Sequence, residues 1–416
     1  MVEVLKLINY IITIAFIVCY AYQFFYIPVP LFKKKRVRKA GAQNRFAVLI
    51  CGRNEENVIA DLISSLQEQT YDRELTTVFV MADNCTDKTA MVARTMGAIV
   101  YERFNDKLVG KGYALEELYD HVAQDYPGCF DGYFVFDADN ILEPDYIENM
   151  NMVFSEGFEI VTGYRNSKNY GDNWISAGYS LWFLRESRFL NHSRAILGTS
   201  CAISGTGFLF SQRIISNTDG WHFHLLTEDI EFSIYHILKG EKIGFCPDAV
   251  LYDEQPVKFR QSWRQRMRWA RGYLQVYKRF GARLLLGALC GKFSCFDMSM
   301  VIMPAIALTI LSIFFNITLS MLGATHGENL LEAIYSVAES LFQIYIMLFV
   351  IGGITTVSEW KRIHTSKARK LLYTLTFPLF MLTYIPISFV ALFTKVKWKP
   401  IEHHVSAAKF KMEKKN

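Results

Sequence analysis

Residues 46–55 read FAVLICGRNE, six apolar residues that end at a glycine and three polar side chains. A short apolar run closed by glycine is typical of a strand buried in a parallel sheet. Further strand patterns follow at 77–82, 98–102 and 133–136, separated by amphipathic helical patterns near 56–69, 86–96 and 112–124. This alternation predicts an α/β fold, with a Rossmann-like parallel sheet covered by helices. The less regular second half predicts a long helix near 174–195, a glycine-broken strand through 204–208, a helix that starts at Thr227 and an interfacial helix at 279–290.

Polar clusters follow three of these strands, at Arg53-Asn54-Glu55, at Asp83-Asn84 and at Asp137-Ala138-Asp139. Because ligands of parallel sheets bind beyond the carboxyl ends of the strands, we expect the clusters to converge on one crevice. The Asp-Ala-Asp pattern supplies the hard oxygen ligands that Mg²⁺ or Mn²⁺ prefers. Two aspartates that only form a turn would have the same sequence.

Long apolar runs flank this α/β region. Hydrophobic residues make up 51% of the 416 residues, and no acidic or basic residue occurs at 7–32, 298–325, 340–358 or 371–394. Each run can cross roughly 30 Å of hydrocarbon. The basic cluster Lys33 to Lys39 follows the first run, so the positive-inside rule places the central region in the cytosol behind an uncleaved anchor.

The side of the C-terminus is ambiguous from the sequence. One anchor and three later spans would leave it outside, whereas the basic tail favours the cytosol. Pro378 and Pro386 can break the last apolar run into a re-entrant or interfacial form, and we favour a cytosolic tail.

The net charge of +5 comes largely from basic clusters beside the apolar runs. That placement fits anionic lipid headgroups, so no nucleic-acid partner is expected. The eight cysteines contain no Cys-x-x-Cys pair, and we assign them no chemistry.

Two motifs downstream carry candidate chemistry. Gln265, Arg268 and Trp269 share one helical face, which offers an amide, a cation and an aromatic plate to a diphosphate and a sugar ring. An arginine-rich interfacial helix is the alternative. In Thr227-Glu228-Asp229, a carboxylate can act as a general base, although the same residues suit a helix N-terminus capped by Thr227.

These motifs, in this order and ahead of apolar sequence, resemble the membrane-embedded family 2 glycosyltransferases, which include cellulose, chitin, hyaluronan and poly-N-acetylglucosamine synthases. The resemblance runs from about Phe46 to about Phe280. It implies a GT-A-like domain inserted between an N-terminal transmembrane helix and C-terminal transmembrane or interfacial helices. It also implies a metal-dependent inverting hexosyltransferase that extends a β-linked polysaccharide processively from a UDP-sugar. Single transfer to a membrane lipid is the alternative, and a non-catalytic partner that binds nucleotide-sugar is a third.

The resemblance also implies roles for individual residues. Asp229 is the base, and Asp139 with Asp137 binds Mg²⁺ or Mn²⁺. The implied nucleotide-sugar contacts are Asn54, Glu55, Asp83, Lys111, Asp137, Arg266 and Arg268. The implied acceptor contacts are Gly205, Thr206, Glu228, Gln265 and Trp269.

Three of these assignments have plainer alternatives. Asn84-Cys85 replaces the family's usual glycine-serine after Asp83, but asparagine tolerates the same left-handed turn. Without the family, Asp83 would be a turn residue and Lys111 a solvated lysine. Ser204-Gly205-Thr206-Gly207 lacks the spacing of a phosphate loop, and its glycines at the least permit a close backbone approach.

The expected organisation has five parts. These are an anchor with its basic segment (1–40), the glycosyltransferase domain (41–257), the Gln265–Trp269 and interfacial helices (258–295), the C-terminal membrane segments (296–394) and a basic tail (395–416). The tail holds Trp398 and the adjacent His403 and His404, which have no carboxylate at a useful spacing, so we expect a surface tail. The expected location is the plasma membrane, with several spans, a cytosolic catalytic domain and a glycan or lipid acceptor.

Overall fold

A computed structural model describes residues 2–32, 41–303, 308, 311–312, 314–318, 321, 330–396, 398–401, 403 and 410. Its centre is an eight-stranded sheet of order β3-β2-β1-β4-β7-β6-β8-β5. The strands are β1 (Phe46–Gly52), β2 (Thr76–Asp83), β3 (Ile99–Arg103), β4 (Gly132–Asp137), β5 (Ile141–Leu142), β6 (Ile160–Ser167), β7 (Phe208–Ser211) and β8 (Ile243–Asp253).

The first half of the sheet is parallel and the second half is mixed. β3, β2, β1 and β4 run parallel, whereas β7 pairs antiparallel with both β4 and β6. β6 and β8 are parallel, with a register shift at Gly163 and Tyr164. The Rossmann-like GT-A architecture is therefore confirmed.

Successive side chains of a strand point to opposite faces of the sheet, so each strand contributes to two hydrophobic cores, one on each face. On one face, Leu49 packs with α5 (Lys111–Asp125), α10 (Glu228–Leu238) and α11 (Phe259–Leu289). On the other face, Val48 packs with α3 (Ile59–Gln67), α4 (Thr89–Thr95) and α6 (Tyr146–Ser155). Because both faces are buried, β1 is apolar throughout rather than alternating.

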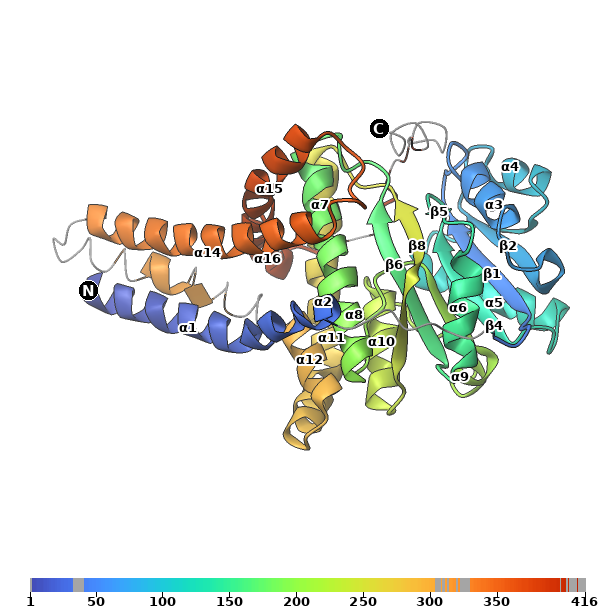
Figure 1. The fold of residues 1–416 in the computed structure, drawn as a ribbon, viewed down its shortest axis with the longest axis horizontal. Coiled ribbons are helices and arrows are strands. Elements are labelled where there is room, and N and C mark those ends of the chain that lie inside the picture. The colour runs from blue at the N-terminus through green and yellow to red at the C-terminus, as the bar shows by residue number, and fades with distance from the viewer. Residues whose placement is uncertain are drawn as a thin grey trace.

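Apolar helices form the second part of the molecule. They are α1 (Val2–Tyr26), α2 (Val29–Phe32), α12 (Phe293–Ile302), α14 (Leu330–Ser358), α15 (Lys367–Leu382) and α16 (Tyr384–Phe393). Three stretches are long and apolar enough to cross a membrane: Glu3–Phe32, Val337–Ser358 and Lys367–Phe393. α1 and α14 contact one another and project together from the sheet domain (Figure 1).

Some expectations about this part lie outside the described residues. The apolar run 298–325 does so in part, and the basic cluster 33–39 does so entirely. The last run is interrupted as its prolines suggested, because α15 ends at Leu382 and α16 begins at Tyr384. Pro378 itself lies inside α15.

The helix expected at 174–195 is built from three pieces. α7 (Trp174–Arg185) begins with a capping box at Asn173, a π-helical turn covers Glu186–Asn191, and α8 (His192–Leu197) ends at left-handed Gly198. π-helical turns inside α-helices occur frequently at functional sites.

α11 is one continuous helix where two separate helices were expected. The Gln265–Trp269 segment and the expected interfacial helix 279–290 form one helix of 31 residues. No proline interrupts the sequence between them, so nothing breaks the backbone hydrogen bonding.

A buried ion pair ties α1 to the sheet domain. Arg194 donates to both carboxylate oxygens of Asp297 at 2.7 and 2.8 Å, and both side chains are at most 1% exposed. Tyr22 and Tyr26 of α1 donate to the same carboxylate. Since every partner is satisfied, this network fixes the angle at which α1 leaves the domain.

Candidate active site

One cavity of about 1380 Å³ connects the sheet to the apolar helices. It begins at the carboxyl ends of β1, β2 and β4, where Arg53, Glu55, Asp83, Asp137 and Asp139 line it. The expected convergence of the three polar clusters is thus observed. The cavity then passes between α7 and α11 and reaches residues of α1, α14 and α16.

Asp83 lies at the sheet end of this cavity between two arginines. Its carboxylate oxygens accept from Arg53 and Arg103, each at 2.7 Å. Asn84 has a φ of 50°, which confirms the left-handed turn expected in place of glycine. Asn54 also has a positive φ and is exposed, and it does not line the cavity.

The Asp-Ala-Asp segment turns away from the end of β4. Asp137 accepts from the Nζ of Lys111 at 2.5 Å, and Lys111 also donates to the Gly205 carbonyl at 2.8 Å. Asp139 is buried and accepts from the Glu254 backbone N–H at 2.7 Å. Burial opposes ionisation of Asp139, but His403, Lys168 and that hydrogen bond lower its pKa below the usual value.

The donor set around Asp139 fits a hard divalent cation. Asp253, Glu254 and Gln255 also line the cavity, and the buried Oδ1 of Asp253 has no hydrogen-bond partner in the described part of the chain. Among the described residues, no group of three acidic, histidine or cysteine side chains is close enough to hold a metal alone. A cation here would therefore take part of its coordination from water or a bound diphosphate, as Mg²⁺ usually does.

The loop Ser204–Gly207 contacts several polar residues of the cavity, namely Lys111, Asp137, Arg165 and Glu186. Thr206 donates to Asn140 at 2.5 Å and accepts from the Asp137 backbone N–H at 2.9 Å. Gly205 and Gly207 have φ values of 82° and 65°. A β-carbon on Gly207 would lie 1.9 Å from Leu251, so only glycine fits there.

The structure thereby corrects two expectations about this loop. The expected strand begins only at Phe208, because Gly205 and Gly207 before it have left-handed rather than extended backbones. Thr206 is buried and does not line the cavity, so it orients Asp137 instead of facing an acceptor.

Glu228 and Asp229 open α10 and both line the cavity. A β-carbon built on Gly205 would be 3.9 Å from the Oδ2 of Asp229, so this carboxylate lies against the loop. Burial and the neighbouring Asp229 raise the pKa of Glu228 to about 7. Burial also raises the pKa of Asp229, against the opposing charges of Arg268 and Lys111.

The capping role left open for Thr227 is wrong. Thr227 occupies the N-cap position, but its side chain makes no capping hydrogen bond, and its buried hydroxyl has no hydrogen-bond partner among the residues that the structure describes. Its methyl and hydroxyl pack instead against Gly272 of α11, at the place where a β-carbon on that glycine would clash.

One face of α11 completes the cavity. Gln265, Arg268 and Trp269 all line it, as their spacing predicted. Arg268 donates to the Leu226 carbonyl at 3.0 Å, and the Oε1 of Gln265 is buried without a partner among the described residues. Trp269 packs edge-on against Tyr179 and Phe183, which fixes the plane of its ring.

Arg266 lies on a different face of α11 and does not line the cavity. It is fully buried and donates to the Phe380 carbonyl and the Thr383 hydroxyl at the junction of α15 and α16. Its guanidinium also lies over the rings of Phe380 and Tyr384. The structure does not support a nucleotide contact for Arg266, because helical spacing turns it about 100° from Gln265.

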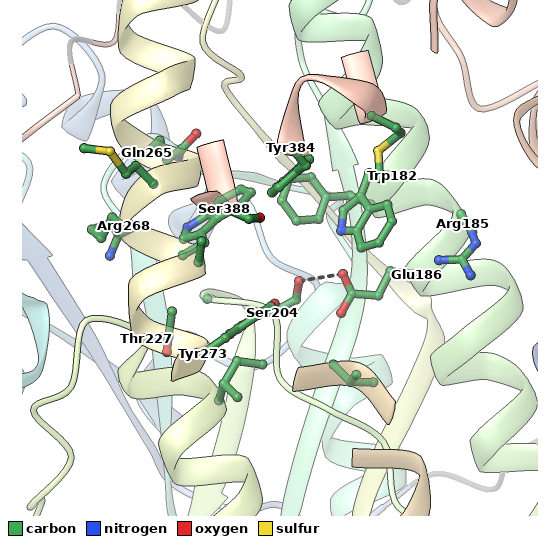
Figure 2. A pocket seen from close by; sticks show the side chains of 18 of the residues that line it. Trp182, Arg185, Glu186, Ser204, Thr227, Gln265, Arg268, Tyr273, Tyr384 and Ser388 are labelled. Atoms are coloured by element: carbon green, nitrogen blue, oxygen red, sulfur yellow. Dashed lines mark hydrogen bonds between the residues drawn. The ribbon is translucent and has the colours of Figure 1, made fainter. Parts of the chain in front are cut away.

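The cavity also contains charged residues that the sequence motifs did not indicate. Arg165 donates to Asp253 and to the Ser204 carbonyl, and its guanidinium lies 3.6 Å from the Phe183 ring centre. Glu186 projects from the π-helical turn opposite Tyr273 and Arg268 of α11 (Figure 2). The signal for Arg165 and Asp253 was weak, because their strands β6 and β8 carry no motif.

The C-terminal segment enters the cavity, which contradicts the expected surface tail. Trp398 lies 4.9 Å from the Arg53 guanidinium, and the Nδ1 of His403 is 2.9 Å from Glu55. Burial opposes protonation of His403, but Asp139 and Glu55 raise its pKa to about 10. A protonated imidazole is not a metal ligand. His404 lies outside the described residues.

Comparisons with known proteins agree with this geometry. Residues 43–272, more than half of the chain, match the model of a family described as glycosyltransferase like family 2. A β-monoglucosyldiacylglycerol synthase of Synechocystis is 24% identical over 236 residues, which cover 55% of this chain and 48% of that protein. A poly-β-1,6-N-acetyl-D-glucosamine synthase of Staphylococcus aureus is 24% identical over 231 residues, 54% of each chain. The chain thus spans about half the length of these curated relatives.

Among solved structures, the chain resembles a mannosyltransferase from Pyrobaculum calidifontis, described in complex with GDP-Man and Mn²⁺. The TM-score is 0.60 at 14% identity, and the alignment covers 93% of this chain and 98% of the other. At this identity the likeness supports the fold.

Proposed function

Because the chain belongs to glycosyltransferase family 2, we propose that it transfers a hexose, with inversion, from a UDP-sugar to a glycan at the membrane boundary. The observation that carries this proposal is the single cavity. Asp137, Asp139, Asp229 and Trp269 all line it, together with residues of the apolar helices. The proposed donor, base and acceptor sites therefore share one cavity.

The proposed chemistry is a direct displacement. Asp229 takes the proton of an acceptor hydroxyl, and that oxygen attacks the anomeric carbon of the donor from the side opposite the diphosphate. The bond from this carbon to the diphosphate oxygen breaks, which inverts the configuration. Arg268 and Lys111 lie in the same cavity and stabilise the charge of the departing diphosphate.

A divalent cation completes this assignment. Mg²⁺ or Mn²⁺ held by Asp139 and Asp137 would add positive charge at the leaving diphosphate. The mannosyltransferase of the same fold is described with Mn²⁺. Lys111 forms an ion pair with Asp137. In the absence of donor, the lysine thus compensates the charge that the cation would otherwise compensate.

A panel of nucleotide sugars tests the reaction. Purified protein in detergent with Mg²⁺ or Mn²⁺ should release UDP from at least one of UDP-glucose, UDP-N-acetylglucosamine and UDP-galactose. GDP-mannose serves as the comparison donor. No turnover of any of the four donors by folded, membrane-extracted protein would contradict the proposal.

A lipid acceptor is the second candidate, and one observation favours it. Beyond Trp269 the cavity continues between apolar residues of α1 and α14, including Phe16, Ile17, Leu341 and Ile344. An acyl chain would fit such walls. Product size separates the candidates, because a processive enzyme yields polymer and a lipid glycosyltransferase adds one sugar to a lipid.

The proposed location is the plasma membrane, with several spans and the sheet domain in the cytosol. The three apolar stretches and the basic residues around them support it. Proteolysis of inside-out and right-side-out vesicles would test the orientation.

Trp269 gives a sharper test of acceptor binding. We expect Trp269→Ala to lower acceptor occupancy about thirtyfold, because sugar stacking on an indole is mostly apolar contact worth about 2 kcal/mol. Elongation should fall far more than UDP-sugar hydrolysis, and Trp269→Phe or Tyr should recover much of it. Radiolabelled polymer and free UDP, measured together, give both rates.

Trp263→Ala is the matched control. Trp263 lies on the same helix and packs on Phe259, and it does not line the cavity. If Trp269→Ala made polymer at the normal rate, or if both variants lost the same fraction of polymer synthesis, acceptor binding by Trp269 would be contradicted. α11 would then act as an interfacial anchor.

A further inference from the structure

The position of Glu186 is unusual for a carboxylate. It begins the π-helical turn that interrupts the helix from Trp174 to Leu197, and its side chain points into the cavity between α7 and α11 (Figure 2). A π-helical turn shifts the register of the side chains that follow. Here it presents an acid in a part of the cavity that is also lined by Trp182, Trp269, Tyr273 and Tyr384.

Among the described residues, Glu186 forms no ion pair. Three arginines act on its charge, but Arg165 and Arg194 form their ion pairs with Asp253 and Asp297, and Arg185 donates to Gln23. The side-chain hydrogen bond of Glu186 that the structure describes comes from the Ser204 hydroxyl, at 3.2 Å to Oε2. Burial raises the pKa of Glu186. With one hydrogen bond from a neutral hydroxyl, this carboxylate has acceptor capacity left for a ligand.

The loop places Glu186 next to the reacting centre. Ser204, its hydrogen-bond partner, immediately precedes Gly205, which lies against the Oδ2 of Asp229. Arg165 holds the Ser204 carbonyl and so fixes this spacing. From the base outwards, the cavity thus presents Asp229, then the loop, then Glu186.

We propose that Glu186, with Trp182 and Tyr273, forms a subsite for the second sugar unit of the acceptor, beyond the unit held at Trp269. A sugar offers vicinal hydroxyls that donate to a carboxylate and an apolar ring face that stacks on an indole. An acyl chain would leave the carboxylate unsatisfied, which is costly in a buried site. This inference rests on the proposed function and selects a glycan acceptor over a bare lipid hydroxyl.

Acceptor length is the test. With the donor found active in the panel, KM is measured for two acceptor pairs, methyl β-glucoside against cellobiose and N-acetylglucosamine against chitobiose. We expect the wild type to bind the better disaccharide more tightly than its monosaccharide. Glu186→Gln should raise KM for the disaccharide about tenfold more than KM for the monosaccharide, the loss of charge-assisted hydrogen bonds.

Two further variants separate binding from folding. Ser204→Ala removes only the hydroxyl that orients Glu186 and should cause a smaller shift in the same ratio. Glu74→Gln, an exposed glutamate in a short 3₁₀ turn, is the matched control and should leave the ratio unchanged. Glu186→Asp, which keeps the charge, should recover part of the disaccharide preference.

The possible outcomes distinguish the two proposals. If Glu186→Gln changed KM equally for the monosaccharide and the disaccharide, the subsite would be overturned. Glu186 would then only stabilise the Ser204–Gly207 loop. Transfer by wild type to dioleoylglycerol vesicles and to no saccharide would overturn the subsite while leaving glycosyl transfer intact. Absence of donor turnover under every condition would remove both.

Discussion

Asp229→Asn should lower the rate of glycosyl transfer by roughly 10²–10⁴ while UDP binding is retained. The amide keeps the size of the side chain and can keep the hydrogen bonds of the helix N-terminus, but it takes no proton. Steady-state turnover and UDP affinity, measured on the same preparation, separate the loss of the base from loss of the site.

Glu228→Gln is the critical comparison, because Glu228 is adjacent, lines the same cavity and also has a raised pKa. Asp229 lies against the Gly205 loop, which also contacts Asp137 and Glu186. We therefore expect the larger loss in Asp229→Asn. A larger loss in Glu228→Gln would transfer the role of base to Glu228.

The pH dependence gives the same assignment a second test. A general base acts only when deprotonated, so kcat should fall as the pH drops through its pKa. Because burial raises the pKa of Asp229 from its ordinary value of 3.8, this acid limb should lie at a higher pH than for an exposed aspartate. A rate that stays flat down to pH 4 would contradict a buried carboxylate base.

The first half of the fold could be predicted from the sequence because each strand is apolar and each is followed by a helix. β1 to β4 occupy the expected ranges to within one or two residues. β6 and β8 were not assigned. Their strands alternate apolar with polar residues near the carboxyl ends, and the polar ones, Arg165 and Asp253, face the cavity.

Residues of the site could be predicted where they belong to a short sequence motif. They could not be predicted where only a tertiary contact brings them to the cavity. Asp137, Asp139, Asp229, Gln265 and Trp269 were identified from local motifs. His403 and Trp398 could not be placed in this way, because 348 residues separate His403 from Glu55. Because no carboxylate lies at a useful spacing from the two histidines in the sequence, we predicted a surface tail. The carboxylate that contacts His403 is that of Glu55, which follows β1.

Arg266 and Arg268 show that a sequence motif alone does not predict which side chains face the cavity. Both are basic, two residues apart on one helix, and the sequence favoured the nucleotide for each. The packing of α11 against α16 decides between them: Arg266 fills the break between α15 and α16, and Arg268 faces the cavity. Helical geometry predicts that they diverge, but not which one faces the donor.

Asp139→Ala should abolish transfer in a way that added metal does not restore, with a loss of about 10³-fold or more in kcat, since charge neutralisation at the diphosphate is lost. In the wild type, chelation with EDTA should stop the reaction, and Mg²⁺ or Mn²⁺ in excess should restart it. Calorimetric titration of Mn²⁺ with UDP present should detect binding to the wild type and not to the variant.

Asp83→Asn provides the control at the same end of the cavity. Asp83 is held by Arg53 and Arg103, so it is less available than Asp139 to a cation, and its loss should weaken UDP binding while metal still rescues the remaining rate. Among the described residues, Asp139 accepts from the Glu254 backbone N–H and from Asn140 at 3.4 Å, which leaves acceptor capacity for a cation. Full transfer by wild type in the presence of chelator would remove the metal from the mechanism and leave Lys111 and Arg268 to stabilise the diphosphate alone.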